Sequence, residues 1–144
     1  MILNSIYAFI ATIGFAVLFN IRRKNIIYAA IGGGISWFIY LLMLNHQHSA
    51  TFALFAATLV VSIYSESMAR IIKTPVTTFI ICSIIPLVPG AGMYNTMYAT
   101  IRGDLNKSLS AGLETIISAG AIAVAIVLVS STARLIFSRK KLLK

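Results

Sequence analysis

The feature that most constrains this chain is a series of long, uninterrupted apolar stretches that together occupy almost its whole length. Hydrophobic residues make up 59% of the 144 positions and charged residues only 10%, whereas a soluble domain has about 25% charged residues. A helix that spans a bilayer takes about 20 residues, and no stretch shows the alternation of a membrane β-strand. The sequence therefore predicts an all-α integral membrane protein and excludes a water-soluble globular fold.

Charged and polar residues divide the apolar sequence into five segments, each long enough to cross a bilayer. Because the connections are short, neighbouring segments are expected to be antiparallel. We expect a single membrane domain over residues 1–144, with transmembrane segments at residues 2–21, 26–44, 51–69, 75–101 and 108–137.

Basic residues lie at alternate ends of these segments and predict the orientation. The basic clusters are Arg22, Arg23 and Lys24, then Arg70 and Lys73, then Arg139, Lys140, Lys141 and Lys144. Of the intervening connections, residues 45–50 have no Lys or Arg, and in residues 102–107 two bases are partly offset by Asp104. Basic ends stay in the cytoplasm, so the N-terminus is expected outside and the C-terminus inside, in the cell (inner) membrane. A re-entrant fourth segment would put the basic tail outside, which favours five crossings. In a membrane protein, a net charge of +9 indicates cytoplasmic helix ends and contact with anionic lipid, and we do not interpret it as a sign of nucleic-acid binding.

The fourth segment contains the least helix-compatible sequence in the chain. Residues 86–92 read Pro-Leu-Val-Pro-Gly-Ala-Gly, and each proline removes a helical partner from the carbonyl four residues earlier, on Cys82 and Ile85. We expect one half-helix to end near Ile85 with bare carbonyls, and another to begin near Ala91 or Gly92 with bare N–H groups. The fourth segment is thus predicted to be a broken helix.

A helix broken at membrane depth survives only against protein or a wet cavity, and transporters use such breaks to hold substrate. The alternative is a proline kink repaired by neighbours such as Ser83. In the substrate hypothesis, the N–H groups of Gly90, Gly92 and Met93 bind a carboxylate. The candidate substrate-binding residues are Pro86, Pro89, Gly90, Gly92, Met93, Tyr94 and Asn95.

Two carboxylates lie within the expected spans and are candidates for proton or ion coupling. Glu66 stands in a polar run of the third span, but Arg70 four residues later offers a purely structural ion pair. Glu114 lies about two turns into the fifth helix, where favouring the positive helix end is the structural alternative. No nucleotide-binding motif, metal-ligand cluster or nucleophile–base pair is visible, so we expect no cofactor, no metal and no enzymatic activity.

Four stretches resemble one transporter family. Residues 74–79 and 85–94 resemble the signature of the threonine/serine exporter (ThrE) family, in its smaller, C-terminal-type subunit. Residues 15–20 resemble the end of that family's first helix, and the helix with Gly32, Gly33 and Gly34 resembles its second. Arg22 departs from the pattern, because members often have a proline there.

This resemblance implies export of small polar metabolites, either threonine and serine or dicarboxylates such as succinate. It also implies a separate, larger membrane subunit, so that this chain is the small subunit of a two-component secondary exporter and part of a homo- or hetero-oligomer. The alternative hypothesis is a non-transporting scaffold or accessory subunit that stabilises a partner.

Overall fold

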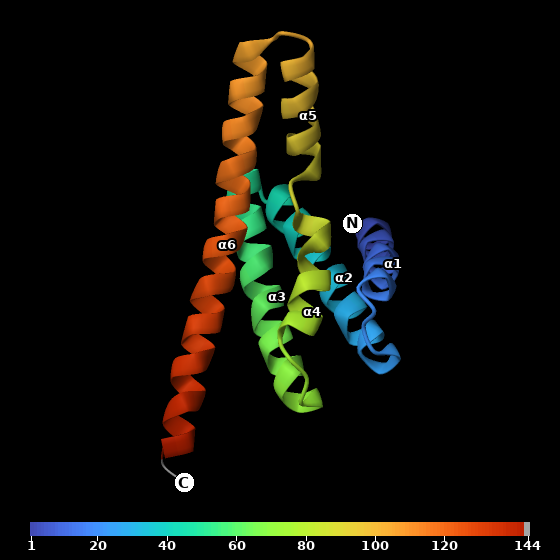
Figure 1. The fold of residues 1–144 in the computed structure, drawn as a ribbon, viewed down its shortest axis with the longest axis vertical. Helices are drawn as coiled ribbons and strands as arrows, with labels where there is room; N and C mark the ends of the chain where they lie inside the picture. Colours follow the sequence, from blue (N-terminus) through green and yellow to red (C-terminus); the bar gives the residue numbers. More distant parts are fainter. Residues whose placement is uncertain (143–144) are drawn as a thin grey trace.

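The computed structural model describes the backbone of residues 1–142 and the side chains of residues 1–135, and over that range all regular secondary structure is helical (Figure 1). The side chains of Arg139, Lys140, Lys141 and Lys144 lie outside the described residues. The elements are α1 (Ile2–Leu18), α2 (Arg23–Asn45), α3 (Ala50–Ile72), α4 (Thr77–Ile84), the 3₁₀ turn η1 (Ile85–Leu87), α5 (Gly90–Ile101) and α6 (Leu105–Leu142).

Three of these helices are long and apolar enough to cross a bilayer, namely α2, α3 and the Leu105–Leu135 part of α6. Together, α4 with η1 and α5 also meet this test as a pair bent by 52°, which fits either one broken span or a re-entrant loop. The apolar helix α1 has 17 residues, at the lower limit of a span. Three spans are thus evident from length and composition, and five crossings remain a prediction.

Backbone turns and caps, not the limits of the apolar runs, set the helix ends. α1 stops at Leu18, before residue 21, and Asn20 in the turn that follows has a left-handed φ of 53°. α3 continues to Ile72, where Lys73 caps it in the same conformation. α6 already begins at Leu105, because the Asp104 carboxylate accepts the backbone N–H of Lys107 at 3.1 Å. This hydrogen bond lowers the pKa of the Asp104 carboxyl.

The central helix is α2, which packs against α1, α3 and α4. Close approach depends on two glycines, because a Cβ at Gly32 would collide with Ser83 of α4 and a Cβ at Gly33 with Thr12 of α1. Small residues at helix contacts are the usual basis of packing in membranes, where the hydrophobic effect does not drive helices together. The glycine-rich turn of α2 therefore holds the body of the molecule together.

The helices α5 and α6 form a hairpin that stands partly apart from this body. The N-terminal part of α6 packs against α5 and its later part against α3, and the hairpin extends beyond the ends of α2 and α3 (Figure 1). On α5, Ala99 is buried, whereas Met93, Met97 and Ile101 are each more than half exposed.

Replacing Gly33 by alanine is expected to destabilise the fold by about 1–3 kcal/mol, as overpacking does. Thr12 has no room to yield, since it is fully buried and its hydroxyl donates to the Ala8 carbonyl at 2.7 Å. Gly34→Ala is the control, because its new Cβ would meet its nearest atoms at 3.5 Å, an ordinary contact. Thermal unfolding of the purified chain in detergent, followed by circular dichroism, measures both. Equal melting temperatures for the two variants would contradict the close α1–α2 contact.

Candidate functional site

The interruption between α4 and α5 forms one wall of the candidate site. α4 ends at Ile84, η1 covers residues 85–87 with Pro86 in its first turn, and α5 begins at Gly90 with Pro89 as its N-cap residue. Pro89 has a ψ of 56°, outside the helical range. The chain direction consequently changes by 52° within a few residues.

The carbonyls on the α4 side of the interruption are not bare, which corrects the expectation from the sequence. The Cys82 carbonyl accepts the N–H of Ile85, and the Ile85 carbonyl accepts the N–H of Val88 at 3.1 Å. The tighter i to i+3 pattern of a 3₁₀ turn replaces the bonds that the prolines remove. The two carbonyls that the prolines deprive of their helical partners are therefore both engaged.

The serine at the end of α4 completes this repair. The Ser36 hydroxyl of α2 shares its hydrogen between the Gly33 carbonyl at 2.8 Å and the Ser83 carbonyl at 3.0 Å, and the Ser83 hydroxyl donates to the Ala29 carbonyl at 3.0 Å. Both serines are fully buried. The repaired kink that was weighed as the alternative therefore describes the α4 side of the interruption.

On the α5 side two backbone donors remain available. Gly90 donates its N–H to the Val88 carbonyl at 2.7 Å, and Met93 donates to the Pro89 carbonyl at 3.2 Å. The N–H groups of Ala91 and Gly92 have no acceptor among the described residues. The free donors at this helix start are thus Ala91 and Gly92, whereas two of the three amides expected from the sequence are engaged.

A cavity of about 490 Å³ lies against this helix start. It brings together six of the candidate residues, and α2, the first turns of α3 and the hairpin helix α6 complete its walls. Because Ala50, Thr51 and Leu54 at the start of α3 line it, the interruption lies at one end of the α2–α3 pair and not halfway along it. The six candidates are Pro86, Pro89, Gly90, Gly92, Asn95 and Glu114.

Glu114 is the one acidic residue in the wall of this cavity. Its carboxylate has no hydrogen bond or ion pair within the part of the chain that the structure describes. A helix start with free N–H groups attracts negative charge, while a carboxylate attracts positive charge. The cavity therefore presents both kinds of partner to a small zwitterionic ligand, and a volume of this size suits one.

Two candidates on α5 face away from the cavity. Met93 is 59% exposed and Tyr94 is 67% exposed, and neither lines the cavity. The Tyr94 ring stacks on Tyr98 with centroids 6.0 Å apart, and the Arg102 guanidinium lies 4.7 Å from the centre of the Tyr98 ring. These side chains form an outer column along α5, typical of an interfacial aromatic belt.

Glu66 also lies away from the cavity. Its carboxylate pairs with the Arg70 guanidinium at 3.1 Å, the structural arrangement that the i, i+4 spacing offers. The two residues line a separate hollow of about 400 Å³ between α3 and α6. The structure therefore places the two candidate coupling carboxylates in different environments, Glu66 in an ion pair and Glu114 without a partner.

Residues of α2 and of a later turn of α6 also line the cavity, although no sequence pattern identified them as candidates. Trp37 and Tyr40 line the cavity with their rings 5.2 Å apart, and Thr115 and Ser118 follow Glu114 along the α6 wall. Trp37 is the single tryptophan of the chain. The spacing of Trp37 and Tyr40 puts both on one helix face, but only the fold shows that this face meets the interruption.

If the cavity holds water, a thiol at residue 118 is expected to react with a hydrophilic maleimide at least about tenfold faster than one at residue 117, because only a hydrated thiol forms the reactive thiolate. Ser118 lines the cavity. The side chain of its neighbour Ile117 does not line the cavity, and 57% of its surface is exposed elsewhere on the helix. The comparison uses Ser118→Cys and Ile117→Cys in a Cys82→Ser background in membranes. Equal rates would rule out a distinct wet cavity.

Comparisons with known proteins place the chain in a family. The family described as "Threonine/Serine exporter, ThrE" matches residues 4–132. An uncharacterized protein of Haemophilus influenzae is 26% identical over 102 residues, which cover 71% of this chain and 34% of that protein. The chain therefore spans about a third of the length of this relative, and no solved structure matches it. Since the family match covers nearly the whole sequence, the chain belongs to the threonine/serine exporter (ThrE) family.

Proposed function

We propose that this chain is the small subunit of a two-component secondary exporter of small polar metabolites, and that substrate binds in the cavity beside the α4–α5 interruption. Family membership supports the transporter class. The observation that carries the proposal is the pairing, in one cavity, of the unoccupied Gly92 amide with the unpaired Glu114 carboxylate. In this proposal the N-terminus lies outside and the C-terminus in the cytoplasm, as the basic residues indicate.

The chemistry of the cavity favours a hydroxy amino acid over a dicarboxylate. The carboxylate of threonine or serine would accept the N–H groups of Ala91 and Gly92, and its ammonium group would pair with Glu114. The Asn95 amide and the Ser118 hydroxyl are available for the substrate hydroxyl. Succinate would instead place a second negative charge beside the Glu114 carboxylate, and the two like charges would repel each other.

We assign energy coupling to the two membrane carboxylates, because the sequence has no nucleotide-binding motif. Glu114 faces the substrate cavity directly and is the first candidate for a proton carrier. Glu66 would exchange a proton only when its ion pair with Arg70 opens. Neither carboxylate requires a cofactor or metal for this role.

A larger membrane subunit would supply the rest of the transport path. The relative from Haemophilus influenzae is about three times as long as the matched region, which leaves room for such a part within one chain. The outer face of the α5–α6 hairpin is a suitable contact, since Met97, Ile101 and Leu109 are exposed there. The same contact is available to a scaffold, so transport itself must be measured.

Efflux of threonine, serine and succinate from loaded cells tests the proposal. Cells express this chain, its presumed large partner, or both, and we expect export of threonine and serine only when both chains are present. Export by the partner alone, merely raised by its greater abundance, would make this chain an accessory scaffold and overturn the proposal.

A variant pair in the same assay tests the site. Glu114→Gln is expected to lower the efflux rate at least about tenfold at unchanged chain abundance, because a hydrogen bond to a charged group contributes about 1.5–3 kcal/mol. Asp104→Asn is the control, since it removes a carboxylate outside the cavity. If both variants export at the same rate, Glu114 has no part in substrate binding or coupling.

A further inference from the structure

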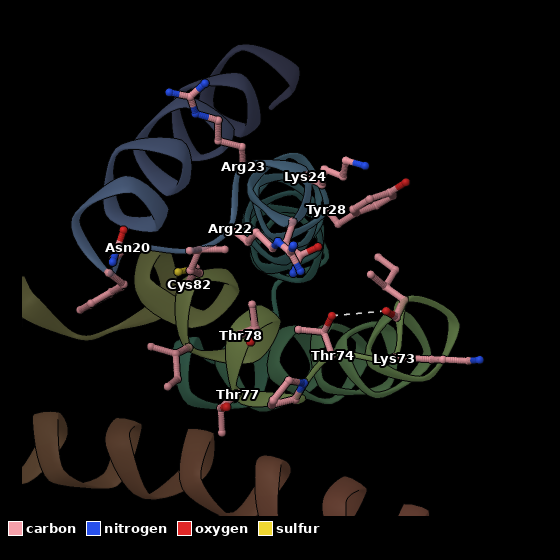
Figure 2. Close-up of a pocket in the computed structure, with 16 residues that line it drawn as sticks. Asn20, Arg22, Arg23, Lys24, Tyr28, Lys73, Thr74, Thr77, Thr78 and Cys82 are labelled. Carbon is pink, nitrogen blue, oxygen red and sulfur yellow. Dashed lines mark hydrogen bonds between the residues drawn. The ribbon is translucent and has the colours of Figure 1, made fainter.

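A second and larger cavity lies at the other end of α3. Its volume is about 1180 Å³, and it opens between the α1–α2 turn and the start of α4 (Figure 2). Lys73, directly after α3, lies in its wall, whereas the cavity beside the interruption contacts the first turns of α3. The two cavities are therefore separate, and we have assigned this one no role in transport.

The electrostatic character of this cavity is strongly positive. Four cationic side chains line it and no Asp or Glu does, and none of the four has an ion pair within the described residues. In Figure 2 Arg22 lies at the centre of the view, while the other three cations spread outward. The four are Arg22, Arg23, Lys24 and Lys73. Such a cluster attracts a multiply charged anion.

A buried amide in the same wall is without a partner. Asn25 is only 5% exposed, it lines the cavity, and its side chain makes no hydrogen bond among the described residues. Among the described residues, the fully enclosed side-chain atoms without a hydrogen-bond partner are the Ser62 and Ser65 hydroxyls, so the Asn25 amide keeps contact with the open space of the cavity. A ligand in the cavity that accepts a hydrogen bond would satisfy it. Attraction of basic residues to the membrane surface does not account for this amide.

Two helix starts contribute further donors. α2 begins at Arg23 and α4 at Thr77, and both residues line the cavity. The backbone N–H groups of Lys24 and Thr77 have no acceptor among the described residues. Positive helix ends that converge with arginine form the usual surroundings of a bound phosphate.

We propose that this cavity binds a phosphate-type oxyanion, and that its source is the headgroup of an anionic phospholipid. Phe19 and Ile81 also line the cavity and are 53% and 47% exposed, so they offer apolar contacts for an acyl chain beside the headgroup. Basic helix ends face the cytoplasm, where anionic lipids gather. Free inorganic phosphate is the other source of the same chemistry. This proposal does not depend on export.

Lipid binding to the purified full chain tests the proposal. Native mass spectrometry in detergent gives the affinity for phosphatidylglycerol and phosphatidylcholine, and calorimetry gives that for sodium phosphate. The test variant is Arg22→Gln with Lys73→Gln. The control is Arg102→Gln with Lys107→Gln, two exposed cations, of which Arg102 directly follows α5 and Lys107 lies in the first turn of α6. Each pair lowers the net charge from +9 to +7, since 9 − 2 = 7.

We expect the chain to bind phosphatidylglycerol more tightly than phosphatidylcholine. The test pair is expected to weaken the binding of phosphatidylglycerol roughly 25-fold, at about fivefold per cation. The control pair is expected to change this affinity less than about twofold. Binding of sodium phosphate alone, with the same selective loss, would support the site and assign it to a soluble anion. The proposal would be overturned if the test pair and the control pair lost the same affinity for phosphatidylglycerol. It would also be overturned if the chain bound the two lipids equally well and did not bind phosphate.

Asn25→Leu separates ligand binding from folding. This substitution replaces the amide by an apolar side chain with the same number of heavy atoms, so the melting temperature without added lipid is expected to change by only a few degrees. The affinity for phosphatidylglycerol is expected to fall at least about fivefold, the loss of one hydrogen bond to a charged group. Unchanged affinity in a folded variant would show that the amide does not face the ligand and would contradict the proposal.

Discussion

The constraint on which this structure depends is that backbone N–H and carbonyl groups in a bilayer must find partners within the protein. Two prolines in the fourth segment remove the helical hydrogen-bond partners of nearby backbone groups. The fold supplies other partners on one side of the interruption only. The 3₁₀ turn and the Ser36–Ser83 hydrogen bond satisfy the α4 carbonyls. On the α5 side, two N–H groups stay free against a cavity. The two sides therefore differ, and the free N–H groups at the start of α5 are the reason why we propose that the cavity binds a negatively charged group.

Close packing of α2 makes this repair possible. The Ser36 and Ser83 hydroxyls reach across the α2–α4 contact because Gly32 leaves room beside Ser83. α2 then brings Trp37 and Tyr40 to the interruption, and α6 brings Glu114 from the other side. The residues that surround the candidate substrate thus come from five elements far apart in sequence, positioned by contacts between small side chains.

Sequence reasoning succeeded where the physical cause is local. The spans at residues 26–44 and 51–69 differ from α2 and α3 by no more than three residues at either end, because long apolar runs define them. It failed where the cause is tertiary. The outward position of Tyr94 and the role of Trp37 depend on how α5 meets its neighbours, whereas the Met93 amide is engaged locally by the Pro89 carbonyl at the start of α5. Glu66 was named for its place in a polar run of the third span, with an ion pair to Arg70 as the structural alternative, and the fold shows that the two residues are paired.

The central claim is that substrate occupies the cavity beside the interruption. Protection of a thiol in its wall tests this claim most directly, with Ser118→Cys in a Cys82→Ser background of the assembled exporter. The account predicts that threonine slows maleimide labelling at residue 118 in a concentration-dependent way, and that Glu114→Gln abolishes this protection. Undiminished labelling at a threonine concentration that saturates export would contradict the account, because the substrate path would then lie elsewhere.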